Sequence, residues 1–471
     1  MAQSISGTDG TNGRHGTHRG GRTRRAWLAQ IGAAPAGALL VACGASTGQS
    51  APSGAGAGTA SNGPVALVLN GTDTEMGEMA AERLPAFEAK FPNVKVQYDN
   101  PPDYGTKLFV LAASGSLGDV AMSYTNQGQY HFLAQNDVFA PHDPLVARDK
   151  YDLKQFYDLA VQPLRIDGKL YVLPFKGQIA RLFAFYNVDM FEARGIRPPT
   201  SSWTYNDLLD AATRLHRGSA DQVEAYGYAG AWKELTTIIA SVRPWGGEVI
   251  STDGKKAQTS TNAVKEALNY HYDMALKRRV AGLTTMIDPN ETFYQGKAAI
   301  LGRVNAGTAG TIFLRAENRF RWGAVRMPKG SSGKRGGMWL PGTMSVTKNS
   351  KNPDAAWELT KWLCDKESGI SLAMQRKGSS TPGARPDVYG DPRLLNREGY
   401  PPNVGEEQRQ AMVEPEPYIT PWNYLGAELH TILGTELDRV TKGELIVNDG
   451  FLQNVTSQLQ AVLDKPPTRL Q

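Results

Sequence analysis

Cysteine and clustered histidine are almost absent from this 471-residue sequence. Cys43 and Cys364 are the two cysteines, and the seven histidines are scattered along the chain. No HExxH motif or other histidine pair has the spacing of metal ligands. No G-x-S-x-G motif, which carries the nucleophile of many hydrolases, occurs either. The sequence therefore predicts no metal site and no cofactor.

A basic run that would indicate nucleic-acid binding is also missing from the body of the chain. The formal net charge is +5 at pH 7. Most of this excess lies before residue 43, where one acid, Asp9, accompanies Arg14, Arg19, Arg22, Arg24 and Arg25. The remainder is close to neutral, so we expect no nucleic-acid partner.

The apolar run near the N-terminus is too short and too interrupted for a transmembrane helix. Residues 26–42 carry no charge but contain Gly and Pro, whereas a spanning helix needs about 20 mostly apolar residues. Arg22, Arg24 and Arg25 precede the run. A basic head, a short apolar run and small residues are typical of an export signal. The pair Arg24-Arg25 resembles the core of a twin-arginine signal.

The tetrapeptide Leu40-Val41-Ala42-Cys43 resembles a bacterial lipobox. In such signals the chain is cut before the cysteine, and the cysteine thiol receives a lipid. The alternative is an ordinary signal peptide with an incidental cysteine. The order of basic head, apolar run and lipobox favours the lipid anchor. We therefore expect residues 1–42 to be a signal peptide and Cys43 to hold the protein at the extracytoplasmic face of a bacterial membrane.

Residues 44–63 form an uncharged stretch rich in Gly, Ala and Ser. Such a stretch behaves as a flexible tether that spans roughly 25 Å on average. One acyl chain holds a protein weakly, so we expect more than one on the anchor. With Cys43 modified, Cys364 has no partner for an internal disulfide. Its surroundings have a helical pattern, and we expect it to be a small buried hydrophobe.

The body from residue 64 to residue 471 is too long for one compact core and suits two domains. Short apolar segments alternate with segments of helical periodicity. This rhythm predicts an α/β fold with a largely parallel sheet. We expect strands at 65–70, 94–98, 119–124 and 181–187, and helices at 75–91, 107–114, 353–369, 426–444 and 450–463.

Several local signals add detail to this outline. Asp167-Gly168 between apolar arms predicts a hairpin, and Thr204 followed three residues later by Asp207 predicts a capped helix start. The proline-rich segment 385–418 suggests an extended excursion between the domains. His271 is expected on an exposed helix.

A series of short segments carries a family resemblance. LAASGSLGDVAMSY, FLAQNDVFAPHD, FAFYNVDMFEARGI and PPTSSWTYNDLLDAATRL come first, followed by WGGEVISTDGK, YQGKAAIL, GAVRMPKG and SVTKNSKNPDAAWELTKWLCDKES. Each segment alone is a weak signal, but their order behind a lipobox and a tether is specific. In this order they resemble the family 1 extracellular solute-binding proteins of ABC importers, the group that includes maltose-binding protein. The resemblance covers most of the body.

The resemblance implies a type II periplasmic-binding-protein fold, with two α/β lobes around a ligand cleft and a hinge. Lobe 1 would comprise residues 64–186 plus 345–400, and lobe 2 would comprise 187–344 plus 401–471. The chain would cross between them near Tyr186-Asn187 and again near residues 341–346. Hinge closure traps the ligand because contacts from both lobes exist only in the closed state. No bond in the ligand is broken, so the resemblance implies a binding protein and no enzyme.

The resemblance also implies the partners. We expect a monomer that captures a carbohydrate, an oligosaccharide in particular, and delivers it to the permease subunits of an ABC importer. In α/β sheets ligands sit beyond the carboxyl ends of strands. A sugar offers its C–H face to aromatic rings and its hydroxyls to polar side chains. Strand ends and resemblance together predict ligand contacts from Thr72, Asp73, Tyr124, Asn126, Gln178, Arg181, Trp232, Trp245, Arg303, Asn305, Trp339 and Trp422.

Core packing is the alternative role for each tryptophan in this set. Ligand contact is favoured for Trp232, Trp339 and Trp422, whereas the two roles are evenly balanced for Trp245. Asp73 and the loop at Tyr124 could equally serve as turn residues. Three further tryptophans, Trp203, Trp357 and Trp362, are expected to pack against helices.

Two other functions stay open at this level. The same fold could bind a non-sugar solute such as a polyol phosphate, a polyamine or a peptide. Several tryptophans and few expected cleft acids argue against a polycation, whereas Arg181 and Arg303 leave an anionic sugar open. An anchored glycoside hydrolase would need two carboxylates facing each other across a cleft. No segment of the chain resembles such an enzyme.

Overall fold

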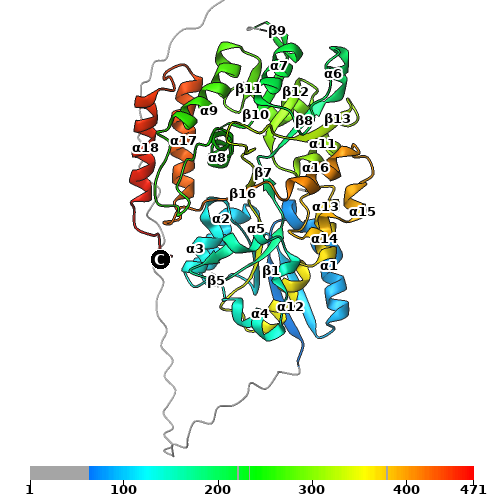
Figure 1. Ribbon diagram of the computed structural model, residues 1–471. Coiled ribbons are helices and arrows are strands. Elements are labelled where there is room, and N and C mark those ends of the chain that lie inside the picture. The colour runs from blue at the N-terminus through cyan, green and yellow to red at the C-terminus, as the bar shows by residue number, and fades with distance from the viewer. Residues whose placement is uncertain (1–62, 220–221, 233, 378–379, 471) are drawn as a thin grey trace, which may run out of the picture. The chain divides into compact units, whose positions relative to one another are not determined.

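Figure 1 shows the computed structural model, which describes residues 63–219, 222–232, 234–377 and 380–470. The predicted signal peptide, Cys43 and the tether up to residue 62 lie outside this part of the chain, so these interpretations stay predictions. Within the described residues, no helix has the length and apolar character needed to span a membrane.

The first sheet has five strands in the order β2-β1-β3-β15-β6. β1 pairs in parallel with β2 and β3, whereas β15 runs antiparallel to β3 and β6. We call this sheet and its helices lobe 1. Its strands are β1 (Val65–Asn70), β2 (Val94–Asp99), β3 (Val120–Tyr124), β6 (Leu173–Lys176) and β15 (Gly342–Val346). The first three confirm the strands expected from the alternating pattern.

Helices cover this sheet, and they include those expected at 75–91, 107–114 and 353–369. α1 runs through Pro85 without a break. The hairpin at Asp167-Gly168 is confirmed, because β4 (Arg165–Ile166) pairs antiparallel with β5 (Lys169–Leu170). The helices are α1 (Asp73–Lys90), α2 (Tyr104–Ala113), α3 (Gln129–Gln135), α4 (Asp143–Asp149), α5 (Asp158–Val161), α12 (Pro353–Leu363), α13 (Lys366–Met374), α14 (Pro386–Tyr389) and α15 (Pro392–Leu395), with short 3-10 turns at Asn126–Gly128 (η1), Leu153–Gln155 and Gln162–Leu164.

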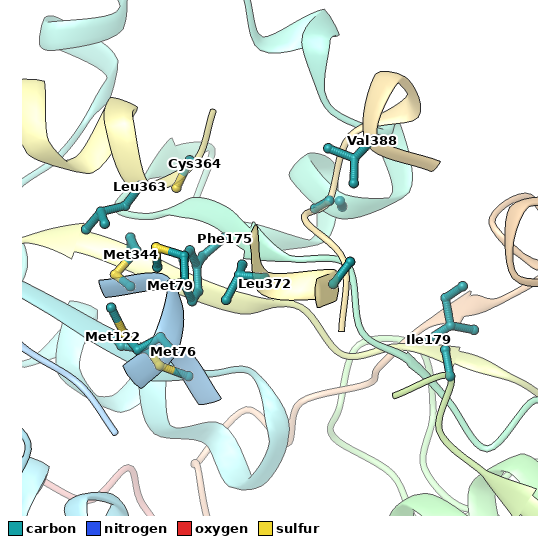
Figure 2. Close-up of a cluster of buried hydrophobic side chains, with 14 of the residues drawn as sticks. Met76, Met79, Met122, Phe175, Ile179, Met344, Leu363, Cys364, Leu372 and Val388 are labelled. Carbon is teal, nitrogen blue, oxygen red and sulfur yellow. The ribbon is translucent and has the colours of Figure 1, made fainter. Parts of the chain in front are cut away.

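Methionine fills much of the space between α1 and the sheet of lobe 1. Met76 and Met79 of α1 lie against Met122 of β3, Met344 of β15 and Phe175 of β6, as Figure 2 shows. All five side chains are buried. The unbranched methionine side chain adapts to irregular gaps, which suits a helix crossing a twisted sheet.

The second sheet, with its helices, forms lobe 2. Its strand order is β11-β10-β12-β8-β13, and the short β9 pairs with β10. β10 is parallel to β11 and β12, whereas β8 is antiparallel to β12 and β13. The strands are β8 (Phe183–Asn187), β9 (Arg217–Gly218), β10 (Val223–Gly230), β11 (Ala281–Leu283), β12 (Ala298–Val304) and β13 (Trp322–Arg326).

The helices of lobe 2 include the capped one that the sequence predicts. The Thr204 side chain accepts from the backbone N–H of Asp207, and the Asp207 carboxylate accepts from Thr204 in return. α17 and α18 pack against each other at one side of the lobe (Figure 1). The helices are α6 (Val188–Ala193), α7 (Tyr205–Leu215), α8 (Leu235–Val242), α9 (Asn262–Tyr272), α10 (Pro289–Tyr294), α11 (Thr308–Arg315), α16 (Asn403–Ala411), α17 (Gly426–Thr441) and α18 (Asp449–Leu463), with a 3-10 turn at Arg243–Trp245 and a π turn at Asp273–Lys277.

Two chain segments that join the lobes pair with a third short segment, which lies between α16 and α17 of lobe 2, to form a small sheet. Its strands are β7 (Ile179–Ala180), β14 (Met338–Trp339) and β16 (Glu416–Pro417), in the order β16-β14-β7. The backbone N–H of Leu340 donates to the carbonyl of Gln178 at 2.9 Å. We call this element the crossing sheet. Its position makes it the hinge about which the lobes would move.

The first crossing lies earlier in the chain than the sequence suggested. The expected boundary near Tyr186-Asn187 falls inside β8, and all of β8 pairs with strands of lobe 2. The chain therefore leaves lobe 1 after Lys176. Every residue of β8 is buried. An unbroken apolar run predicts a buried strand, but it does not indicate which of the two sheets the strand joins.

The segment from residue 385 to 418 contains three short helices, where an extended excursion was expected. Pro386 and Pro392 stand at the first positions of α14 and α15. Proline is favoured at this position because its missing N–H would be unpaired there in any residue. α14 and α15 contact α13 of lobe 1, whereas α16 contacts β13 of lobe 2. The prolines thus start helices in this segment.

Two smaller expectations also need correction. The helix predicted at 353–369 is divided into α12 and α13, because Asp365 caps a new helix by accepting from the N–H of Ser368. His271 is only 2% exposed and does not lie on a solvated face. Its ring packs 4.5 Å from that of Trp232 and 6.1 Å from that of Trp245.

The remaining packing predictions are confirmed. Cys364 is buried and free, and burial raises the pKa of its thiol well above the ordinary value. Trp203 and Trp357 are buried, and the indole N–H of Trp203 donates to the carbonyl of Arg326 at 2.8 Å. The indole of Trp362 lies 4.2 Å from the Arg83 guanidinium.

Candidate functional site

The carboxyl ends of the parallel strands in both sheets lie at the edges where the chain crosses between lobes. In lobe 1, Tyr124 at the end of β3 and Lys176 at the end of β6 lie opposite Gly342, where β15 begins. In lobe 2, Val304 at the end of β12 lies opposite Phe183, where β8 begins. Because the crossing segments leave one edge and enter the other, the two carboxyl edges face each other. This is where an α/β fold presents its ligand site.

A pocket of about 400 Å³ lies between these edges. We call it the inter-lobe pocket. Asn126, in η1 after β3, lines it from lobe 1. Lobe 2 contributes residues after β10 and β11 and the starts of α8 and α17, and Tyr418 directly follows β16 of the crossing sheet. The full lining is Asn126, Glu234, Leu235, Thr236, Thr284, Tyr418, Gly426 and His430.

The lining is rich in groups that pair with hydroxyls. Asn126, Thr236 and Thr284 offer neutral donors and acceptors, and Glu234 offers a carboxylate. The Thr284 hydroxyl accepts from the backbone N–H of Trp232 at 3.0 Å, which fixes the loop after β10 against the loop after β11. His430 of α17 accepts at Nδ1 from the backbone N–H of Leu235 at 3.3 Å. These contacts hold the lobe 2 wall of the pocket in shape.

Glu234 is paired with Arg181, which lies in the first crossing. The Arg181 guanidinium donates to the Glu234 carboxylate. The Arg181 side chain is 13% exposed and that of Glu234 is 47% exposed, so the carboxylate faces the pocket and the guanidinium lies behind it. Burial lowers the pKa of Arg181 to about 10, which leaves it charged at neutral pH.

The backbone of Arg181 is held in an unusual conformation. Its φ is +60°, a region that side chains other than Gly seldom occupy. Its backbone N–H donates to Asn305 Oδ1 at 3.3 Å, and its guanidinium donates to the carbonyl of Arg303 at 3.4 Å. These partners lie at the end of β12. The surrounding structure therefore fixes both the main chain and the side chain of Arg181 at the cleft.

A second buried cation lies at the lobe 1 side of the hinge. Lys176 ends β6, is fully buried and donates to the carboxylate of Glu75 in the first turn of α1. Burial lowers the pKa of Lys176 to about 7. Glu75 is 21% exposed at its side chain. Lys176 and Arg181 bracket β7, so each cation of this crossing is matched by a carboxylate.

The predicted ligand residues of lobe 1 all lie at the carboxyl edge of its sheet. Thr72 and Asp73 follow β1, and the Thr72 hydroxyl lies 3.0 Å from that of Thr74. Tyr124 ends β3, and its backbone N–H donates to Gln129 at 3.3 Å. Gln178 lies in the first crossing and is half-buried. Within this group the inter-lobe pocket includes only Asn126.

Arg181, Arg303 and Asn305 are brought together by the structure, but they have different surroundings. The Arg303 side chain points into lobe 2, where it donates to the carbonyl of Arg335 at 2.7 Å and to the Tyr205 hydroxyl. It also donates to the carbonyl of Arg181 at 3.2 Å. Arg303 is 1% exposed. Its hydrogen bonds in this structure go to groups of the protein, and one of them holds the main chain of Arg181.

The four predicted tryptophans do not line the inter-lobe pocket. Trp232 is 1% exposed and packs on Tyr272 at 5.5 Å as well as on His271. Trp339 is equally buried in the crossing sheet, 5.7 Å from the ring of Tyr157.

The other two tryptophans are half-buried. Trp245 lies 4.3 Å from Tyr205 and 5.4 Å from Tyr270. The indole N–H of Trp422 donates to the carbonyl of Leu463 at the end of α18. In this conformation all four predicted tryptophans contact protein, and ligand contact stays a prediction for each.

Sequence reasoning found Asn126 and missed the other seven lining residues: Glu234, Leu235, Thr236, Thr284, Tyr418, Gly426 and His430. Glu234 and Thr284 follow β10 and β11, so the strand-end rule that found Asn126 would have found them had those strands been recognised. Tyr418 lies four residues before Trp422, and only the tryptophan was singled out as a candidate. His430 stands on a helix that gave no sign of facing a cleft.

The described residues contain no group of three or more His, Cys, Asp or Glu side chains that could hold a metal ion. The site therefore consists of a polar pocket, one carboxylate–guanidinium pair and a hinge. Two α/β lobes that are joined through a small crossing sheet and have a polar pocket between them are the architecture of a protein that encloses a small solute. This is the class that the fold and site define.

The family is shown by direct comparison. Residues 70–370 match the model of the bacterial extracellular solute-binding protein family. The chain belongs to this family. Its role is therefore that of a solute-binding protein at an extracytoplasmic location.

One curated relative is a binding protein of Brucella abortus. It is 24% identical to this chain over 317 residues, which cover 66% of this chain and 74% of the relative. A binding protein of Brucella suis matches with the same identity and coverage.

Solved structures share the fold. An ABC substrate-binding protein from Listeria monocytogenes, in complex with cycloalternan, has a TM-score of 0.70 and 19% identity. The cyclic alpha-maltosyl-1,6-maltose binding protein of Arthrobacter globiformis has a TM-score of 0.69 and 20% identity. The GacH receptor of Streptomyces glaucescens, solved with acarbose, has a TM-score of 0.68 and 20% identity. Each match covers 85% of this chain and 99% of the other. The expected periplasmic-binding-protein fold is thereby confirmed.

Proposed function

We propose that this protein is a lipid-anchored, extracytoplasmic binding protein that captures a carbohydrate, an oligosaccharide in particular, and delivers it to an ABC importer. The observation that carries the proposal is the inter-lobe pocket. Its lining combines Asn126 of lobe 1 with Glu234, Thr284 and His430 of lobe 2, beside the ring of Tyr418. These are the groups that pair with sugar hydroxyls and cover a sugar C–H face.

The hinge supplies the mechanism of capture. Asn126 stands on one lobe, and Glu234 and Thr284 stand on the other. A ligand that bridges them gains both sets of contacts only when the lobes are closed, so binding shifts the population toward the closed state. The closed surface then differs from the open one. This difference allows the permease to recognise the loaded protein.

Several lines support the carbohydrate class. The fold matches proteins described as binding cycloalternan, acarbose and cyclic alpha-maltosyl-1,6-maltose. The lipobox and tether of the sequence support anchoring through Cys43.

We retain Thr72, Asp73, Tyr124, Gln178, Arg181, Asn305 and the four tryptophans as proposed contacts that could reach the ligand in another state of the hinge.

Tryptophan fluorescence and thermal melting test the proposal. The purified protein is titrated with oligosaccharides of different linkage, polyamines, polyol phosphates and peptides, and each mixture is analysed for products. Ligand at 100 times its Kd stabilises the folded state by about 2.7 kcal/mol, which raises Tm measurably. Saturable binding of one oligosaccharide class, recovered unchanged, is the expected result. A response to polyamines or peptides alone would contradict the carbohydrate assignment.

A further inference from the structure

We propose that the Arg181–Glu234 pair makes the cleft selective for uncharged saccharides and against anionic ones such as uronates and sugar phosphates. The inference rests on the proposed carbohydrate function and specifies the ligand class within it. Glu234 is the selecting residue because its carboxylate lines the pocket. Arg181 is the positioning residue because it acts through Glu234.

The Arg181 side chain is already engaged by other groups of the protein. Its guanidinium lies at the first crossing, where a cation would attract an anionic ligand. It is instead committed to Glu234 and to the carbonyl of Arg303. Its main chain is fixed by Asn305. An anion entering the pocket therefore meets the carboxylate and finds the guanidinium already neutralised.

Glu234 presents its carboxylate to the inter-lobe pocket. Its side chain is 47% exposed, and it stands at the N-cap of α8. The helix dipole favours a negative charge at this end. An ionised carboxylate has two oxygens and only accepts hydrogen bonds. Arg181 does not use every acceptor position of the Glu234 carboxylate. The remaining positions can accept hydrogen bonds from sugar hydroxyls, and such charge-assisted bonds are stronger than bonds between neutral groups.

The other cation of the first crossing is buried and paired, so it does not offset the charge of Glu234. Among the described residues, those that line the inter-lobe pocket include one carboxylate and no Lys or Arg. The nearby cation of the first crossing, Lys176, is fully buried and engaged by Glu75. A buried anion needs a cation or several donors to offset its lost hydration. In this pocket it would face Glu234 at close range, and like charges in a closed cleft repel strongly.

The test uses neutral trisaccharides of different linkage, each beside its analogue with one C6 hydroxyl oxidised to a carboxylate. Affinities are measured by titration calorimetry. For the neutral sugar that binds best, the wild-type protein should bind the carboxylate analogue at least about tenfold more weakly. Glu234→Gln should reduce or reverse the preference for the neutral sugar, because it removes the repelling charge and frees the Arg181 guanidinium to pair with the anion. Glu234→Asp, which keeps the charge, should preserve the preference for the neutral sugar.

Two matched controls separate this effect from general changes in charge. Asp354→Asn removes an exposed carboxylate that pairs with Arg148 in lobe 1, and it should leave the ratio unchanged. Lys233→Gln removes the cation that adjoins Glu234 in the sequence. We expect this variant to keep the wild-type ratio of the affinities for the neutral sugar and its carboxylate analogue. Circular dichroism verifies that each variant is folded.

The outcomes distinguish the inference from the function on which it rests. Equal or tighter binding of the carboxylate analogues by the wild-type protein would overturn charge selection and leave carbohydrate binding standing. An unchanged ratio in folded Glu234→Gln would overturn the role of this residue. If no saccharide of either series binds, the proposed function fails and the inference fails with it.

Discussion

The backbone N–H of Leu470 donates a hydrogen bond to Asn136 Oδ1 at 2.9 Å. Leu470 follows α18 of lobe 2, whereas Asn136 ends α3 of lobe 1. The neighbouring Arg469 guanidinium donates to the carbonyl of Gln135 at 3.3 Å. The segment after the last helix thus ties the two lobes together outside the crossing sheet.

Removal of this tie should make the cleft open more readily. Deletion of residues 466–471 removes two hydrogen bonds, each with a net value of about 0.5–1.5 kcal/mol. We expect ligand dissociation to become several-fold faster, as measured by stopped-flow fluorescence. Asn136→Ala should have a similar effect, whereas Asn136→Asp, which keeps the acceptor oxygen, should not. Identical dissociation rates in all three variants and the wild type would show that the tie has no role in closure.

Trp232 should contribute strongly to the stability of lobe 2. It is 1% exposed and packs on His271 and Tyr272. Trp232→Ala should lower the free energy of unfolding by about 3–5 kcal/mol, because it leaves a large cavity. Urea denaturation measures the change. A loss below about 1 kcal/mol would contradict the packing described here, and a loss of sugar affinity in a folded Trp232→Phe variant would support a contact with ligand.

Acidification should destabilise the protein through its buried histidines. Burial lowers the pKa of His131, His142 and His271 to about 3, below the value of about 6.5 in an unfolded chain. Between these values the unfolded state binds protons that the folded state does not. The histidine contribution to stability is therefore full above about pH 6.5 and falls as the pH drops.

The histidine contribution can be isolated at one site. His142 accepts at Nε2 from the backbone N–H of Val346 at 3.2 Å, so the folded state disfavours its protonation. His142→Asn should reduce the dependence of stability on pH between about 6.5 and 3, by up to about 1.4 kcal/mol per pH unit. Chemical denaturation across this range measures the slope. An unchanged slope would mean that His142 is protonated in the folded protein.

The cap of α7 offers a smaller and independent test. Thr204→Ala removes the side chain that accepts from the backbone N–H of Asp207 at 3.2 Å. We expect the free energy of unfolding to fall by about 0.5–2 kcal/mol. Thr213→Ala, in the same helix on an exposed face, is the matched control. Equal effects of the two substitutions would show that the cap adds nothing.

Local patterns predicted the first three strands of lobe 1, its hairpin and its longer helices. The strand at Val65–Asn70 and the hairpin at Asp167-Gly168 follow from apolar runs and turn chemistry, which depend on neighbouring residues alone. The same holds for the cap at Thr204 in lobe 2. Such features survive in the fold because the local preference and the tertiary packing agree.

The pocket was harder to predict because its strands carry weak local signals. β10 contains Gly227, where a Cβ atom would collide with the main chain of Ala212. The glycine is required by the approach of α7, yet it weakens the strand pattern. Without β10, no pattern in the chain singles out Glu234. The burial of Trp232 depends on His271 and Tyr272, which lie far along the chain on α9, and no local pattern reports such contacts.

Titration calorimetry with neutral oligosaccharides, combined with analysis of the recovered sugar, tests the central claim most directly. The account predicts saturable one-site binding of one oligosaccharide class, with the sugar recovered intact and with affinity reduced at least about tenfold by Glu234→Ala. Absence of binding across the neutral series, or conversion of the sugar to product, would contradict it.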